Sequence, residues 1–272
     1  MCAMFWESPD GKIKKTILSP GTPENKPVEG TECKLEITNV SEDLSQYSSI
    51  TIGDVDSDLG RQFEICVTTM FPGEVSKFQI KLDRVVSFTL KLSKMEFNGF
   101  LFEWNARKKC DYANFQKEKG KVHFSEGNLR EAGFRFNKGL KIALSIPINC
   151  EEPPDEIDGV SIEEINQVKA TLYNNLASCF FKKEQWLLVI DYCDKVFVYD
   201  KDNIKGCYKA AVAYIKDRNF EKADEYLKKV LEREPHNKAA IVHHEFVKIK
   251  LKEAEEKSNL LAKKMIGDIL HV

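Results

Sequence analysis

Apolar and polar side chains alternate along three runs in the first hundred residues. These runs are 34–40, 76–82 and 87–92. Alternation places one face of a strand on a core and the other face in water, so the runs predict an antiparallel sheet. Between them, Phe63, Val67 and Met70 recur at the i, i+4, i+7 spacing of a short amphipathic helix.

From about residue 105 the period of apolar positions changes to that of α-helices. The sequence around Ala177 can be laid on the sequence around Ala211 at a shift of 34 residues. A third copy surrounds Gly120, with about 23 additional residues between it and the second copy. A 34-residue period is that of the tetratricopeptide repeat, a pair of antiparallel helices whose stacked copies form a concave groove.

These patterns predict the α+β class, with an antiparallel β-sheet domain followed by an all-α domain of three repeats. The expected boundaries are a sheet domain at 1–104, a repeat domain at 105–236 and a long C-terminal capping helix at 237–272. The expected copies of the repeat are about 113–146, 170–203 and 204–237, with an insertion loop at about 147–162. Prolines and a glycine in the insertion favour a loop, because both residues stop helices.

Charge is unevenly distributed along the chain. The net charge of −2 divides into −5 for residues 1–104 and +3 for the remainder. A modestly basic helical half suits an acidic peptide better than nucleic acid, which requires a stronger basic stripe. No apolar run approaches the length of a bilayer span. We therefore expect neither a nucleic acid nor a membrane as a partner.

The eight cysteines include no C-x-x-C pair, and no nearby histidines complete a zinc motif. We expect reduced thiols, no metal and no cofactor, since a glycine-rich phosphate loop is also missing from the sequence. The first ten residues lack the basic start and apolar core of a secretory signal. A cytoplasmic location is expected, with the nucleus as an additional compartment.

The repeats resemble those of co-chaperones that bind the C-terminal Met-Glu-Glu-Val-Asp tail of heat-shock protein 90. That resemblance implies a carboxylate clamp, in which lysine, asparagine and arginine side chains hold both carboxylates of the last aspartate. The positions that match the clamp are Lys117, Lys121, Asn175, Lys205 and Lys209. Lys121 replaces an asparagine of the family pattern, and Lys209 replaces an arginine.

The clamp positions also make physical sense as a site for carboxylates. Lys117 and Lys121 are spaced i, i+4, as are Lys205 and Lys209, so each pair shares one helix face. A charge-assisted hydrogen bond from such a group contributes about 1.5–3 kcal/mol. Lysine cannot make the planar two-pronged contact of arginine with a carboxylate. We therefore expect Lys209 to give weaker binding or a broader specificity. Ordinary solvated lysines are the alternative interpretation.

The front half resembles an FKBP-type prolyl isomerase domain. The motifs that carry this resemblance are the strand and turn at 10–21, the helix and turn at 63–74, and the closing strand at 87–92. Such a domain holds the X–Pro bond in an apolar aromatic pocket, and several walls of that pocket are replaced here. Phe63 takes the position of the tryptophan that forms the floor of the family's pocket. The Ala-Tyr-Gly loop expected after Leu82 is missing.

Together the two resemblances are typical of the immunophilins with tetratricopeptide repeats, here with a degenerate FKBP-type domain. They imply a non-enzymatic co-chaperone that links heat-shock protein 90 to client proteins, with no catalytic residues. A residual peptidyl-prolyl cis-trans isomerase is one alternative. A repeat scaffold that serves other partners, independently of heat-shock protein 90, is another.

Overall fold

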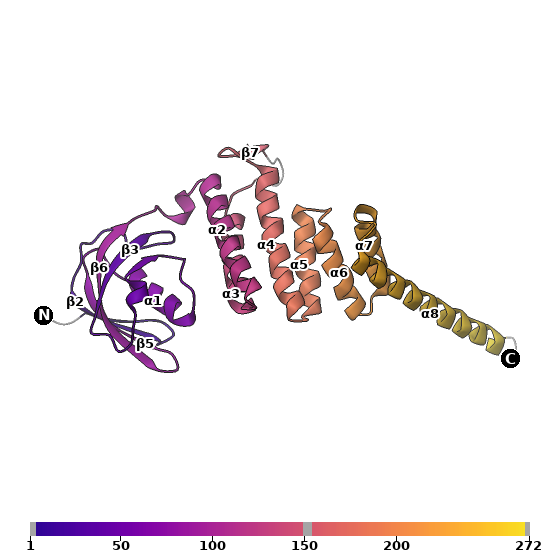
Figure 1. Cartoon of the computed structure of the whole chain (residues 1–272), viewed down its shortest axis with the longest axis horizontal. Coiled ribbons are helices and arrows are strands. Elements are labelled where there is room, and N and C mark those ends of the chain that lie inside the picture. Colours follow the sequence, from indigo (N-terminus) through magenta and orange to yellow (C-terminus); the bar gives the residue numbers. More distant parts are fainter. Residues whose placement is uncertain (1–3, 149–153, 270–272) are drawn as a thin grey trace. The chain divides into compact units, whose positions relative to one another are not determined.

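The computed structural model describes residues 4–148 and 154–269, with residues 262–269 described as helical backbone. The chain divides between Trp104 and Asn105 into two compact units (Figure 1). The first unit holds a curved sheet and one α-helix, and the second holds seven α-helices of the described chain. The predicted α+β class, with the sheet first and the helices second, is confirmed.

Six strands form the sheet of the first unit. They are β1 (Phe5–Glu7), β2 (Ile13–Ser19), β3 (Glu32–Thr38), β4 (Ser49–Thr51), β5 (Val75–Lys81) and β6 (Val85–Glu96). Their order is β1-β2-β5-β6-β3-β4, and every neighbouring pair is antiparallel. The three alternating runs of the sequence became β3, β5 and β6. The edge strands β1 and β4 are additional, and with three residues each they are too short to show an alternation.

The predicted amphipathic helix is α1 (Asp58–Thr68), which packs against β2 and β5. Its first turn is fixed by Ser57, whose hydroxyl accepts a hydrogen bond from the backbone N–H of Gly60 at 3.1 Å. Phe63 and Val67 are fully buried on the side of the helix that faces the sheet. Burial of each such side chain stabilises the unit by about 1.5–3 kcal/mol.

A buried ion pair fastens β2 to the elements around it. The ammonium of Lys15 lies 2.7 Å from the Glu74 carboxylate, and the two side chains are 4% and 1% exposed. Lys15 also donates to the backbone oxygen of Thr69 at 2.8 Å, and Glu74 accepts from the Ser76 hydroxyl at 2.6 Å. Burial lowers the pKa of Lys15, and the hydrogen bond to Glu74 opposes that shift.

Seven helices form the second unit. They are α2 (Ala106–Ser125), α3 (Leu129–Leu144), α4 (Ile162–Lys182), α5 (Trp186–Tyr199), α6 (Ile204–Lys216), α7 (Phe220–Arg233) and α8 (Lys238–Ile269). The helices pack in the successive pairs α2/α3, α4/α5 and α6/α7, and α8 packs on α7 (Figure 1). This is the arrangement expected of three stacked helical hairpins with a closing helix.

Two of these helices begin earlier than the sequence copies indicated. α2 begins at Ala106 rather than near 113, and α4 begins at Ile162 rather than near 170. Each start is capped, because the side chains of Asn105 and Ser161 accept hydrogen bonds from backbone N–H groups in the first turn. These caps lie outside the 34-residue pattern, which is why the period did not locate them.

Part of the insertion between α3 and α4 forms a small hairpin. The expected loop contains β7 (Glu156–Ile157) and β8 (Val160–Ser161), which pair in antiparallel fashion. In the turn, the Asp158 carboxylate accepts a hydrogen bond from the backbone N–H of Ala106 at 2.8 Å. The hairpin therefore satisfies a backbone donor at the first turn of α2.

Small residues allow the two helices of a repeat to approach closely. A side chain at Gly120 would begin 2.5 Å from the ring of Phe136, which is itself buried. The matching Ala177 and Ala211 are fully buried in the later repeats. The positions that define the sequence repeat are thus the positions of tightest helix contact.

Candidate peptide-binding site

The clamp positions lie on the first helix of each hairpin. Lys117 and Lys121 are on α2, Asn175 is on α4, and Lys205 and Lys209 are on α6. α4 contacts both α2 and α6, so these three helices are neighbours within the unit. Asn175 and Lys209 occupy equivalent positions, each two residues before the small residue of its repeat.

The structure brings Lys205 and Lys209 together at one pocket of about 410 Å³. The pocket lies between α4, α6 and the start of α8, and its apolar lining includes Phe124, Phe181 and Tyr208. The other lining residues are Ser178, Lys182, Ile204, Glu234 and Asn237. Glu234 is its acidic lining residue, and its carboxylate accepts a hydrogen bond from the Asn237 amide at 2.8 Å.

Lys209 is the most desolvated cation of this pocket. Its ammonium donates to the Asn174 side-chain oxygen at 2.8 Å and to the backbone oxygen of Lys205 at 3.4 Å. Burial lowers the pKa of Lys209 to about 8, and the positive charge of Lys205 acts in the same direction. Within the described part of the chain, neither lysine forms an ion pair. A carboxylate entering the pocket would supply the missing countercharge.

Two adjacent asparagines of α4, Asn174 and Asn175, lie at the position where the sequence predicted one clamp asparagine. Asn174, which is 8% exposed, makes the hydrogen bond to Lys209. The Nδ2 atom of Asn175 is buried and has no hydrogen-bond partner in the described structure. An unsatisfied buried donor costs about 1–3 kcal/mol. The role of Asn174 was missed because the family pattern marks one asparagine in this repeat, although the Asn174-Asn175 pair was visible in the sequence.

The two lysines of α2 have different surroundings. The side chain of Lys117 is 17% exposed, and its ammonium donates to the Asn114 side-chain oxygen at 2.8 Å. Lys121 pairs with Glu118 at 2.9 Å and lines a separate hollow of about 450 Å³ with Phe115 and Val122. The structure therefore does not place Lys121 in the pocket of Lys205 and Lys209.

Glu118 stands between these two cations. Its carboxylate lies 3.4 Å from the Lys117 ammonium as well as 2.9 Å from that of Lys121. The hydrogen bond from Lys121 lowers the pKa of Glu118, and the contact with Lys117 acts in the same direction. A carboxylate ligand would have to compete with Glu118 for both ammonium groups.

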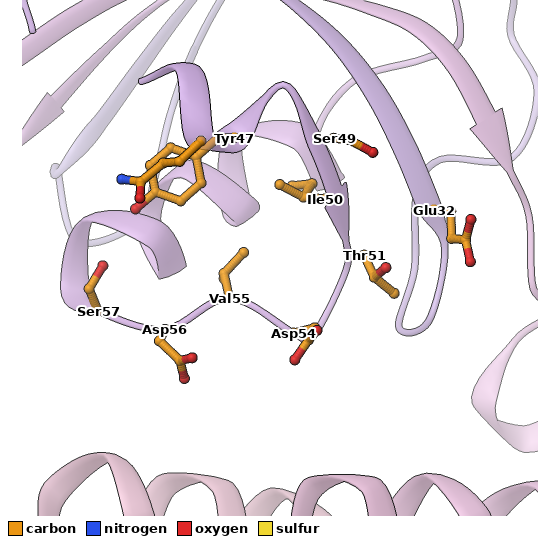
Figure 2. A pocket seen from close by; sticks show the side chains of 10 residues that line it. Glu32, Tyr47, Ser49, Ile50, Thr51, Asp54, Val55, Asp56 and Ser57 are labelled. Atoms are coloured by element: carbon orange, nitrogen blue, oxygen red, sulfur yellow. The ribbon is translucent and has the colours of Figure 1, made fainter. Parts of the chain in front are cut away.

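The first unit has a hollow of about 580 Å³ near the expected isomerase pocket. Figure 2 shows Tyr47, Ile50 and Val55 on its inner side, and the Asp54 and Asp56 carboxylates directed away from Val55. Phe63, the residue at the expected floor, does not line this hollow. The lining is thus largely polar, unlike the apolar walls that an X–Pro bond requires.

An aromatic stack covers the expected floor. The Phe63 ring is fully buried, with the Tyr47 ring stacked on it at a centroid distance of 4.8 Å. Phe88 packs on the same ring at 5.2 Å. The Tyr47 ring therefore covers one face of the buried Phe63 ring.

Other chemistry is limited in the part of the chain that the structure describes. No group of three or more His, Cys, Asp or Glu side chains in residues 4–148 and 154–269 is placed to hold a metal ion. None of the described helices combines the length and apolar character that a bilayer crossing needs. Cys33, Cys179 and Cys193 are free thiols, and burial raises their pKa values to about 12, 11 and 12. Such thiols pack as small apolar groups.

Comparisons with known families confirm the two kinds of domain. Residues 6–97 match the family described as BDBT FKBP-like N-terminal, and residues 204–237 match the tetratricopeptide repeat. The chain thus combines an FKBP-like N-terminal domain with tetratricopeptide repeats.

The chain is similar to FK506-binding proteins over most of its length. It is 27% identical to the FK506-binding protein-like protein of Mus musculus over 242 residues, covering 87% of this chain and 65% of the mouse protein. It is 25% identical to the peptidyl-prolyl cis-trans isomerase FKBP4 of Homo sapiens over 254 residues, covering 86% of this chain and 54% of the human protein. The chain therefore spans less than two thirds of the length of these relatives.

Two solved structures resemble parts of the chain. The C-terminal domain with tetratricopeptide repeats of a Plasmodium falciparum FK506-binding protein has a TM-score of 0.50 and 27% identity, covering 58% of this chain and 99% of that domain. A crystal structure of residues 1–211 of CG17282 has a TM-score of 0.58 and 18% identity, covering 68% of this chain and 96% of the other. The second similarity concerns the fold alone.

Proposed function

We propose that the helical unit binds an acidic C-terminal peptide of the Met-Glu-Glu-Val-Asp type, the tail of heat-shock protein 90. The protein would then act as a co-chaperone or adaptor, without enzymatic activity, in the cytoplasm and the nucleus. The observation that carries this proposal is that Lys205 and Lys209 line one pocket and that neither forms an ion pair in the described part of the chain.

Further features of the pocket support a peptide end as the ligand. A C-terminal aspartate carries two carboxylates, and two cations can each make a charge-assisted hydrogen bond of about 1.5–3 kcal/mol with them. Asn175 does not line this pocket, but it follows Asn174, the partner of Lys209, and its buried Nδ2 is a donor without a partner. The rings of Phe124, Phe181 and Tyr208 supply apolar surface for the side chain before the terminal residue. In this account, Lys117 and Lys121 contact more distant acidic residues of the tail after displacing Glu118.

Calorimetric titration with the peptide Met-Glu-Glu-Val-Asp tests the proposal. Replacement Lys205→Glu should weaken binding at least tenfold, or about 1.4 kcal/mol, because it places a carboxylate where the ligand carboxylate would lie. Lys205 is exposed, so the replacement should not disturb the core. Lys81→Glu, an exposed residue of β5, makes the same change of charge and should bind as the wild type does. Equal binding by all three proteins would favour a repeat scaffold for other partners.

We also infer that the first unit has lost prolyl isomerase activity. The stack of Tyr47 on the buried Phe63 supports this inference, since it covers one face of the ring at the expected floor of the pocket. A prolyl-peptide assay should give the uncatalysed rate, which reflects a barrier of about 18–20 kcal/mol. An accelerated rate that disappears in Phe63→Ala would overturn the inference and favour a residual isomerase.

A further inference from the structure

A second groove lies at the other end of α6 from the clamp lysines. It has a volume of about 590 Å³ and is bounded by the α6–α7 turn and by α8. Its aromatic floor is formed by Phe220 and Phe246, whose rings meet edge to face at a centroid distance of 6.3 Å. Lys205 and Lys216 are eleven residues apart on α6, so the two grooves are separated by about 16 Å along the helix axis.

The lining of this groove is strongly cationic. It includes the four cations Lys216, Arg218, Lys250 and Lys257, and the one carboxylate Glu253. Glu253 is already paired with Lys250 at 2.9 Å. The other three cations form no ion pair within the described part of the chain. The groove therefore retains an uncompensated positive charge beside an apolar floor.

The apolar floor continues along α8 as an exposed stripe. Val242, Phe246 and Ile249 are spaced i, i+4, i+7, and they are 64%, 42% and 58% exposed. Lys250 and Lys257 follow on the same side of the helix at the same helical spacing. α8 extends past α7 (Figure 1), and the exposed fractions of these three apolar side chains show that the stripe is accessible.

We infer that this groove is a second peptide site, which binds an acidic amphipathic helix of a partner protein. Apolar residues of the partner at i, i+4 and i+7 would pack on Phe246 and the α8 stripe. Its flanking Asp and Glu side chains would pair with Lys216, Arg218 and Lys257. The pocket of Lys205 and Lys209, here called the clamp pocket, recognises a chain end, whereas this groove recognises internal acidic residues. The two sites could therefore bind two different protein chains at the same time.

A fluorescence-anisotropy titration of the full chain can test the site. The probe is a labelled 18-residue helical peptide of Leu, Ala and Glu, with Leu at i, i+4, i+7 and i+11 and with an amidated C-terminus. Amidation removes the terminal carboxylate that the clamp pocket would bind. A companion peptide with Gln in place of every Glu has the same shape without the negative charge.

The double replacement Lys216→Glu/Arg218→Glu should weaken binding of the acidic probe at least tenfold. The single replacement Lys257→Glu, at an exposed residue, should weaken it less, by about threefold. Lys205→Glu, the matched change in the clamp pocket, should alter the affinity less than about twofold. The Gln peptide should bind at least about tenfold more weakly than the acidic probe. Equal affinities for the double variant and Lys205→Glu, or no binding of the acidic probe to the wild type, would overturn the proposal.

Discussion

Lys209 is a desolvated cation of the proposed peptide site, and its charge depends on pH. Its ammonium is held by Asn174 at 2.8 Å beside Lys205, and burial lowers its pKa to about 8. The free protein therefore begins to lose this charge just above neutral pH, whereas an exposed lysine would keep it. A bound carboxylate would favour the charged form and raise the pKa again.

The affinity of the proposed peptide should consequently depend on pH. Below about pH 7 Lys209 is charged and binding should be constant, and between pH 7 and pH 9 the affinity should fall by up to about tenfold as the proton is lost. In Lys209→Arg this decline should disappear, because the guanidinium stays charged over the whole range. Titrations at pH 6.5, 7.5 and 9 compare the two proteins. A parallel decline in both would assign the pH dependence to another group.

The contact between Gly120 and Phe136 predicts a stability effect at the residue scale. Gly120→Ala places a methyl group 2.5 Å from a buried ring, whereas Gly133→Ala in α3 meets no atom within 4 Å. Both replacements gain about 1 kcal/mol of helix propensity. Gly120→Ala should therefore be less stable than Gly133→Ala by the overpacking cost, about 1–3 kcal/mol. Urea unfolding followed by circular dichroism at 222 nm measures the difference, and equal stabilities would contradict the close packing.

At the scale of the element, neighbouring residues of β2 have opposite environments. Lys15 points inward to Glu74 with 4% exposure, and Lys14 points outward with 52% exposure at 3.8 Å from Glu7. The same residue type thus carries a structural charge at one position and a solvated charge at the next, as strand geometry dictates. A charged residue on the inner face was not expected from the alternation, because its partner lies 59 residues away in sequence.

Replacement of these two lysines should separate their roles. Lys15→Met leaves Glu74 buried without its partner and should cost about 3–5 kcal/mol, whereas Lys14→Met should cost less than about 1 kcal/mol. Hydrogen exchange of the β5 amides reports the stability of the first unit alone. Similar protection in the two variants would contradict a structural role for the buried pair.

The sequence predicted elements well where their residues repeat a pattern. Alternation located β3, β5 and β6, and the apolar spacing located α1. The hairpin of β7 and β8 was missed, because strands of two residues have no period. At the proposed site, the spacing placed Lys205 and Lys209 on one helix face, but the hydrogen bond from Lys209 to Asn174 depends on how α4 packs against α6. Likewise the ion pair of Lys121 with Glu118 depends on side-chain conformations, which the repeat pattern does not predict.

At the scale of the whole molecule, the two units differ in charge and in the kind of surface they offer. The first unit carries −5 and encloses a filled aromatic core, whereas the remainder carries +3 and has hollows lined by cations, including the pocket of Lys205 and Lys209 and the groove of Lys216 and Lys250. We therefore expect the proposed recognition of acidic segments to reside in the helical unit. Because electrostatic steering weakens as salt increases, peptide affinity should fall as ionic strength rises.

The central claim is that cations of the helical unit converge on the carboxylate of a chain end. The most direct measurement compares the peptide Met-Glu-Glu-Val-Asp with its C-terminal amide in calorimetric titrations of the full chain. The account predicts that amidation weakens binding at least tenfold, and that Lys205→Glu makes the two peptides bind alike. Equal affinity of the wild type for the free acid and the amide would contradict it.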